Sequence, residues 1–130
     1  MANRNFDGVQ ALGKGVTLIA GNFAVDGAGA VTAQVPTVAN AAPFTVTKPA
    51  ATTGQYLITL QDPYGAVLAV LPSVLKSAGA NVYKADVAAY SASSGTVTLQ
   101  VHDTTSGAAV DPATIEVDFL LVLKNSSVWP

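Results

Sequence analysis

Residues 114–125 decide the fold and read Thr-Ile-Glu-Val-Asp-Phe-Leu-Leu-Val-Leu-Lys-Asn. Every second residue from Ile115 to Leu123 is apolar, which is the period of a β-strand. The residues between them begin charged at Glu116, become apolar at mid-length and end charged at Lys124. A strand with one fully apolar face and a second face apolar only at mid-length is typical of the centre of a sheet. We therefore expect another sheet, a loop or another subunit to cover part of its outer face.

Similar short runs of alternating residues occur throughout the chain, bounded by Gly, Pro, Asn, Asp and Ser. They are residues 14–25, 30–35, 44–47, 55–61, 66–76, 82–92 and 95–103. Run 66–76 suits either a helix or a buried strand, but its valines favour a strand with Pro72 at an edge or bend. About eight short strands and no required helix predict an all-β fold, either an antiparallel β-sandwich or a small barrel.

Glycines indicate where the strands bend and turn. Gly21 and Asn22 predict a bulge or bend within the first strand. The stretch Asp26-Gly27-Ala28-Gly29 predicts a hairpin turn, because glycine accepts positive φ angles. This stretch does not have the features of a phosphate loop, since no helical segment or P-loop lysine follows it.

A single β domain is expected over residues 14–130, because a chain of 130 residues fits one domain. Residues 1–13 are polar and punctuated by Gly8 and Gly13, so we interpret them as an N-terminal arm. A short helical turn and a frayed terminus are the alternatives for this segment. Arms of this kind often lie on a neighbouring subunit.

Composition excludes several functional classes. Half of the residues are hydrophobic, only 11% are charged and the net charge is −2, so no nucleic-acid or membrane partner is expected. The chain has no cysteine, which excludes disulfides and thiolate zinc sites. The N-terminus lacks the apolar core of a signal peptide, and no apolar run is long enough to span a bilayer. We expect the protein to be made and used without crossing a membrane.

No catalytic constellation is recognisable in the sequence. His102 is the single histidine, and its neighbour Asp103 points to the opposite face of a strand. Glu116 and Asp118 share a face, but we interpret them as the solvated end of a half-exposed strand. A Gly-x-Ser-x-Gly nucleophile elbow is absent, and no metal-ligand spacing surrounds His102. The prediction is a protein that is not an enzyme and has no catalytic residue, cofactor or metal site.

Three stretches resemble small β-rich virion proteins of tailed bacteriophages. These stretches are the opening Met-Ala-Asn-Arg-Asn-Phe, residues 54–60 (Gly-Gln-Tyr-Leu-Ile-Thr-Leu) with the following Asp62-Pro63-Tyr64, and residues 117–127 (Val-Asp-Phe-Leu-Leu-Val-Leu-Lys-Asn-Ser-Ser). Proteins of this kind resemble capsid decoration, or cement, proteins, which sit outside the shell, usually as homotrimers, and brace it against internal DNA pressure. The resemblance implies as partners the major capsid protein and further copies of this chain. It implies synthesis in the host cytoplasm and a final place on the capsid surface.

The residues expected at a capsid or subunit interface are Asn3, Arg4, Asn5, Phe6, Leu120, Val122 and Trp129. The first four belong to the arm, Leu120 and Val122 are the apolar part of the outer strand face, and a tryptophan in a tail is costly to leave in water. Two alternatives stay open. One is a tail or fibre structural protein. The other is a stand-alone carbohydrate-binding β-sandwich that uses Tyr83, Tyr90 or Trp129.

Overall fold

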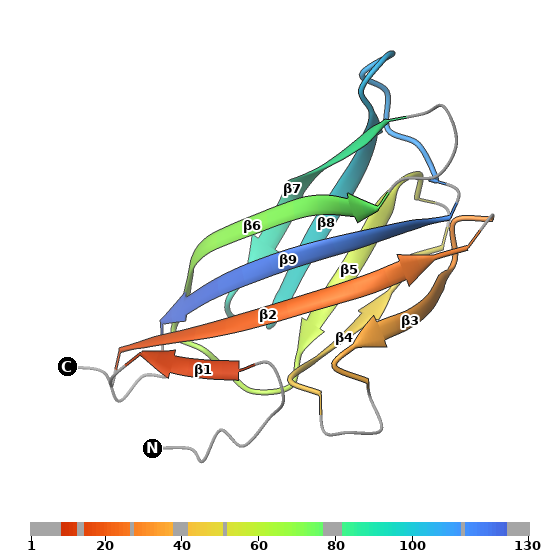
Figure 1. The fold of residues 1–130 in the computed structure, drawn as a ribbon. Helices are drawn as coiled ribbons and strands as arrows, with labels where there is room; N and C mark the ends of the chain where they lie inside the picture. Colours follow the sequence, from red (N-terminus) through yellow and green to blue (C-terminus); the bar gives the residue numbers. More distant parts are fainter. Residues whose placement is uncertain are drawn as a thin grey trace.

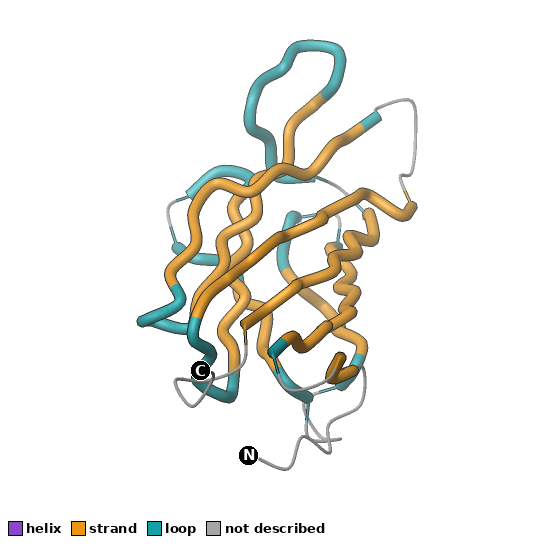
Figure 2. Tube along the Cα trace, turned by 90° about the vertical axis from the view of Figure 1, so that its left-hand side faces the viewer, coloured by secondary structure: helices purple, strands orange, loops and turns teal. Residues whose placement is uncertain are grey.

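The computed structural model describes residues 9–12, 15–26, 28–37, 42–50, 52–76, 82–112 and 114–124. These residues form β-strands joined by loops, without a helix (Figures 1 and 2). The strands are β1 (Val9–Leu12), β2 (Val16–Val25), β3 (Val31–Val35), β4 (Phe44–Thr47), β5 (Gln55–Leu60), β6 (Ala66–Lys76), β7 (Tyr83–Ser91), β8 (Thr96–Asp103) and β9 (Ile115–Lys124). Strands β2 to β9 match the eight predicted runs, whereas β1 was not predicted as a strand.

The strands form two antiparallel sheets packed as a β-sandwich, which confirms that prediction. Sheet A has five strands in the order β1-β2-β9-β6, with β3 also paired to β2. Sheet B has four strands in the order β4-β5-β8-β7. Figure 1 shows β2, β9 and β6 in front of β5 and β8. Two such sheets bury their facing apolar sides against each other.

Strand β9 occupies the centre of sheet A, as its pattern predicted. It pairs with β2 on one side and with β6 on the other. Strand β6 is an end strand, so Pro72 lies at an edge, where its missing N–H costs no ladder hydrogen bond. The choice of strand over helix for residues 66–76 is confirmed.

The core lies between the sheets. The predicted inward face of β9 is buried along its whole length, and so are the alternate residues of β5 and β8. Aromatic rings fill the middle: the ring centroid of Phe23 lies 5.2 Å from that of Tyr56, and Phe44 meets Phe119 edge-on at 5.0 Å. Such tilted and edge-to-face pairs are favourable geometries for aromatic side chains.

The expected bulge at Gly21 and Asn22 is wrong. Strand β2 stays in register with β9 from Val16 to Val25, and its irregularity falls at Ala24 and Val25 against β3. The glycine has another reason, because a Cβ at Gly21 would overlap the rings of Phe119 and Phe44. Close approach of two core aromatic rings requires glycine here.

Part of the predicted arm belongs to the sheet. Residues Val9–Leu12 are extended and pair antiparallel with β2, from Val9 opposite Ile19 to Leu12 opposite Val16. Strand β3 pairs with the other half of the same edge of β2. Residues 1–8 lie outside the described residues.

Candidate interaction surface

The outer face of sheet A carries an apolar band across its three long strands. Residues directly opposite in antiparallel strands share a face, so the register defines rows across the sheet. Leu18, Val122 and Ala69 form one row. The next row is Ala20, Leu120 and Leu71. We call these six residues the apolar band.

The structure thus places predicted Leu120 and Val122 at the centre of the apolar band. Both side chains are half-buried. Their partners Leu18 and Leu71 come from strands that are distant in sequence. In Figure 1 no described strand lies in front of the outer face of sheet A. A contiguous apolar patch that remains open to solvent is typical of an interaction site.

Strand β6 also carries exposed leucines at the edge of the sheet. The exposed fractions of Leu68, Leu71 and Leu75 are 53%, 58% and 65%. Register shifts between Val67 and Ala69 and between Val74 and Lys76 leave Leu68 and Leu75 as the extra residues of two bulges. Sequence reasoning missed these leucines, since periodicity alone does not locate a bulge.

Charged side chains of β9 border the apolar band on both sides. On one side Lys124 lies between Val16 and Ala66. On the other side Asp118 lies between Asn22 and Ser73, and Glu116 lies one row further out. The face is therefore basic at one end of β9 and acidic at the other.

The outer face of sheet B has a different chemistry. Thr45, Thr59, Thr96 and Ser91 are successive partners across its four strands and form a row of hydroxyl side chains. Gln55 and Gln100 form part of another row, where their side-chain amides lie 3.3 Å apart. This face is polar, so the two outer faces of the sandwich offer different surfaces to a partner.

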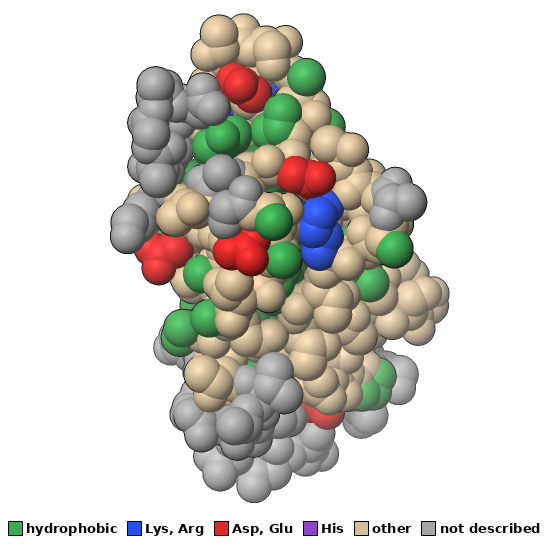
Figure 3. Space-filling model, turned by 90° about the vertical axis from the view of Figure 1, so that its right-hand side faces the viewer, with side chains coloured by type: hydrophobic (Ala, Val, Ile, Leu, Met, Phe, Trp, Pro, Cys, Tyr) green, Lys and Arg blue, Asp and Glu red, His purple; other side chains and the backbone are tan. Residues whose placement is uncertain are grey.

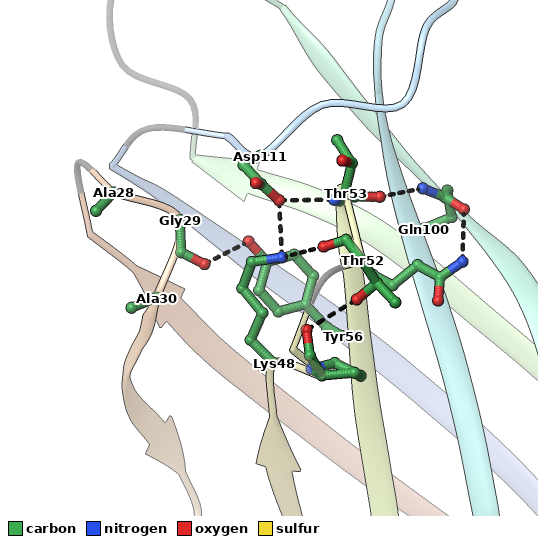
Figure 4. Close-up of polar contacts among 12 residues, drawn as sticks. Ala28, Gly29, Ala30, Lys48, Thr52, Thr53, Tyr56, Gln100 and Asp111 are labelled. Atoms are coloured by element: carbon green, nitrogen blue, oxygen red, sulfur yellow. Dashed lines mark hydrogen bonds and ion pairs between the residues drawn. The ribbon is translucent and has the colours of Figure 1, made fainter.

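A polar cluster closes one end of the sandwich (Figure 4). The Nζ atom of Lys48 lies 2.7 Å from Oδ1 of Asp111 and donates a hydrogen bond of the same length to the carbonyl of Thr52. The N–H of Gly54 also donates to Oδ1 of Asp111, at 2.7 Å. Lys48 Nζ lies 5.3 Å from the ring centroid of Tyr56, whose hydroxyl donates to the Gly29 carbonyl at 2.8 Å.

The electrostatics of this cluster favour one fixed protonation state. The hydrogen bond from Lys48, followed by that from Gly54, holds the pKa of Asp111 below its usual value, against the effect of desolvation. Burial, followed by the charges of Asp111 and Asp26, raises the pKa of the Tyr56 hydroxyl far above its usual value. The lysine–aspartate pair and the neutral tyrosine link the β2–β3 hairpin, the β4–β5 loop and the β8–β9 loop.

A shallow hollow lies beside this cluster. It is lined by Ala30, Lys48, Pro49, Ala50, Thr52, Thr53 and Asp111. Figure 3 views the molecule from the right-hand side of Figure 1. On this side, acidic side chains lie at separate places and do not gather into one patch. The charged groups that line the hollow are already paired with each other, so its geometry suits bracing of loops.

His102 lies on the outer face of sheet B, opposite Lys84 of β7. Its Nε2 is 3.7 Å from Oδ2 of Asp86, which also lies 3.5 Å from Nζ of Lys84. Among the described residues, no group of three or more His, Asp or Glu side chains is arranged to hold a metal ion. Glu116 and Asp118 do share the outer face of sheet A, as predicted.

The other predicted interface residues, Asn3, Arg4, Asn5, Phe6 and Trp129, lie outside the described residues. The described part of the chain contains no helix that could cross a membrane. Comparisons with protein-family models, with curated proteins and with solved structures found no match.

Proposed function

We propose that this chain is a bacteriophage virion structural protein, a capsid decoration protein that binds the outside of the shell and stabilises it. The observation that carries the proposal is the apolar band on the outer face of sheet A of a small β-sandwich. A surface of this kind suits a protein that acts through contacts between surfaces. The resemblance of the three sequence stretches supplies the virion context.

The proposed mechanism is mechanical. Each copy contacts the major capsid protein weakly, and many copies tie neighbouring shell subunits together, so that avidity makes the whole layer stable. The N-terminal residues Asn3 to Phe6 are the proposed shell contact. The protein is made in the host cytoplasm and ends on the capsid surface. It uses no cofactor and catalyses no reaction under this proposal.

The first test is the copy number of the protein in particles banded on a density gradient. A decoration protein is expected in numbers comparable to the shell subunit, measured by quantitative mass spectrometry. A few copies per particle would contradict decoration and favour a tail or fibre component. Absence from the particle band would remove the virion proposal.

The second test concerns the shell contact. A chain that lacks residues 1–6 retains β1, which begins at Val9, and is expected to keep its circular dichroism spectrum. It should fail to co-sediment with undecorated shells, whereas the full chain should bind. The Arg4→Ala variant keeps Asn3, Asn5 and Phe6. Comparing its shell binding with that of the truncated chain separates the contribution of the Arg4 charge from that of the whole segment. Unchanged binding of the truncated chain would contradict the proposed contact.

One observation favours a second candidate function. Tyr90 on edge strand β7 has an exposed fraction of 63%, and exposed aromatic rings stack on sugars in carbohydrate-binding sandwiches. A glycan array tests this candidate directly. Binding that is lost in Tyr90→Ala would support a carbohydrate-binding module, and an array without any signal would dispose of it.

A further inference from the structure

The charges that border the apolar band are placed symmetrically along β9. Leu120 and Val122 lie on either side of Leu121, and Asp118 and Lys124 lie three residues before and after it. All four side chains lie on the outer face of sheet A, because they alternate with the buried residues of β9. The face is therefore apolar at its middle, acidic on one side and basic on the other.

We propose that two copies of this chain pair through the outer faces of sheet A. A two-fold axis in the interface passes over Leu121, and the two β9 strands run antiparallel across it. Leu120 of each copy then faces Val122 of the other, and the remaining residues of the apolar band cover each other. The same patch is used on both copies, as a two-fold contact requires.

Charge complementarity selects this alignment. Under the two-fold axis, Lys124 of one copy faces Asp118 of the other, and the contact occurs twice. Face-to-face sheets pack about 10 Å apart, a gap that extended lysine and aspartate side chains span together. If the β9 strands ran parallel instead, Lys124 would face Lys124 and Asp118 would face Asp118, which like-charge repulsion opposes.

Neither the charge of Lys124 nor that of Asp118 is neutralised by an opposite charge among the described residues. The Oδ1 atom of Asp118 is buried and has no hydrogen-bond partner there. A buried carboxylate oxygen without a donor is costly, and a lysine from a second copy would supply a donor once the carboxylate turns toward the interface.

The pairing rests on the same apolar band as the proposed function, but it does not require the virion context and its test measures self-association alone. It also differs from the homotrimer that the sequence resemblance implies. A closed trimer uses one patch against a different patch, whereas this contact joins like to like and gives a dimer or another even-numbered assembly.

Sedimentation equilibrium of the full chain tests the pairing. A dimer is expected at micromolar concentration; a monomer or a trimer would overturn the proposal. Leu120→Lys should weaken dimerisation about 100-fold or more, because it places an unpaired charge at the centre of the interface. Leu57→Lys is the matched control, since Leu57 is half-buried on the outer face of sheet B. This control should remain dimeric, and equal weakening by both variants would overturn the proposal.

Charge reversal tests the alignment without disturbing the core. Lys124→Glu alone and Asp118→Lys alone should each raise the dissociation constant about tenfold or more. The chain that carries both reversals should dimerise almost as tightly as the wild type, because the two exchanged side chains again face each other with opposite charge across the interface. Circular dichroism checks that each variant is folded. A double variant no tighter than the single variants would overturn the antiparallel alignment.

Discussion

The Oε1 atom of Gln34 accepts a hydrogen bond from the N–H of Val46, 3.0 Å away in the other sheet. The Nε2 atom of Gln34 donates to the carbonyls of Phe44 and Pro36, at 2.9 Å and 3.0 Å. Strand β4 is an end strand of sheet B, so one of its edges has no neighbouring strand. The buried side chain of Gln34 takes that place and joins β3 of sheet A to β4 of sheet B.

Replacing Gln34 should therefore destabilise the whole sandwich. Gln34→Leu keeps the approximate volume but leaves the buried Val46 N–H and Phe44 carbonyl without partners. We expect the free energy of unfolding to fall by about 3 kcal/mol, measured by urea denaturation. Gln55→Leu is the control, because Gln55 is half-buried on the outer face of sheet B and its side chain donates a single hydrogen bond, to Gln100, among the described residues. Equal losses in the two variants would contradict a bridging role for Gln34.

Gly21 should tolerate no side chain while both neighbouring rings are present. The added methyl group of Gly21→Ala would overlap the rings of Phe119 and Phe44, and we expect a loss of about 2 kcal/mol in unfolding free energy from overpacking. In a Phe44→Leu background the same change should cost clearly less, because the smaller side chain leaves room. Denaturation of the four proteins in this cycle measures the coupling. Strictly additive losses would show that the two positions do not compete for space.

Asp111 should make the stability of the protein sensitive to acid. Its pKa is lowered in the folded state by Lys48 and Gly54, so the folded protein holds the proton less tightly than the unfolded chain. The resulting stability is present above the ordinary carboxyl pKa and is lost as the pH falls through the lower folded value. Asp111→Asn should cost about 1 kcal/mol at neutral pH, since the partly exposed pair is screened by solvent.

The difference between wild type and Asp111→Asn should shrink when denaturation is repeated from about pH 5 down to about pH 2. Lys48→Met removes the main cause of the lowered Asp111 pKa. Its free energy of unfolding should therefore depend less on pH over this range than that of the wild type, as in Asp111→Asn. If the difference between wild type and Asp111→Asn stayed constant across this range, Asp111 would not be the source of the acid-dependent stability.

Tyr56 should give the opposite pH dependence. Burial raises its pKa in the folded state, so its stabilising effect is complete below the ordinary tyrosine pKa and is lost as the pH rises above about 10. Tyr56→Phe removes the hydrogen bond to the buried Gly29 carbonyl and should cost about 1.5 kcal/mol at neutral pH. The variant should then lose less stability than the wild type between about pH 8 and about pH 11. Equal alkaline losses would show that other groups account for the effect.

Prediction of the candidate surface from sequence succeeded only in part. The mixed outer face of residues 114–125 identified Leu120 and Val122, because alternation reports which residues of one strand share a face. The sequence could not show that Leu18 and Leu71 lie beside these two residues, because pairing between distant strands leaves no local signal. Gln34 gave no signal either, because a single glutamine in a short strand is ordinary until the free edge of β4 is placed beside it.

The sequence by itself determined the strands. Apolar side chains at every second position can be buried together only in an extended chain, and Gly, Pro, Asn, Asp and Ser bound the runs where the backbone must turn. Tertiary structure decided the strand order, the division into two sheets and the pairing of residues 9–12 with β2. It also decided that Gly21 makes room for two aromatic rings. These features depend on contacts between segments far apart in the chain, whose energies arise only when the sheets pack.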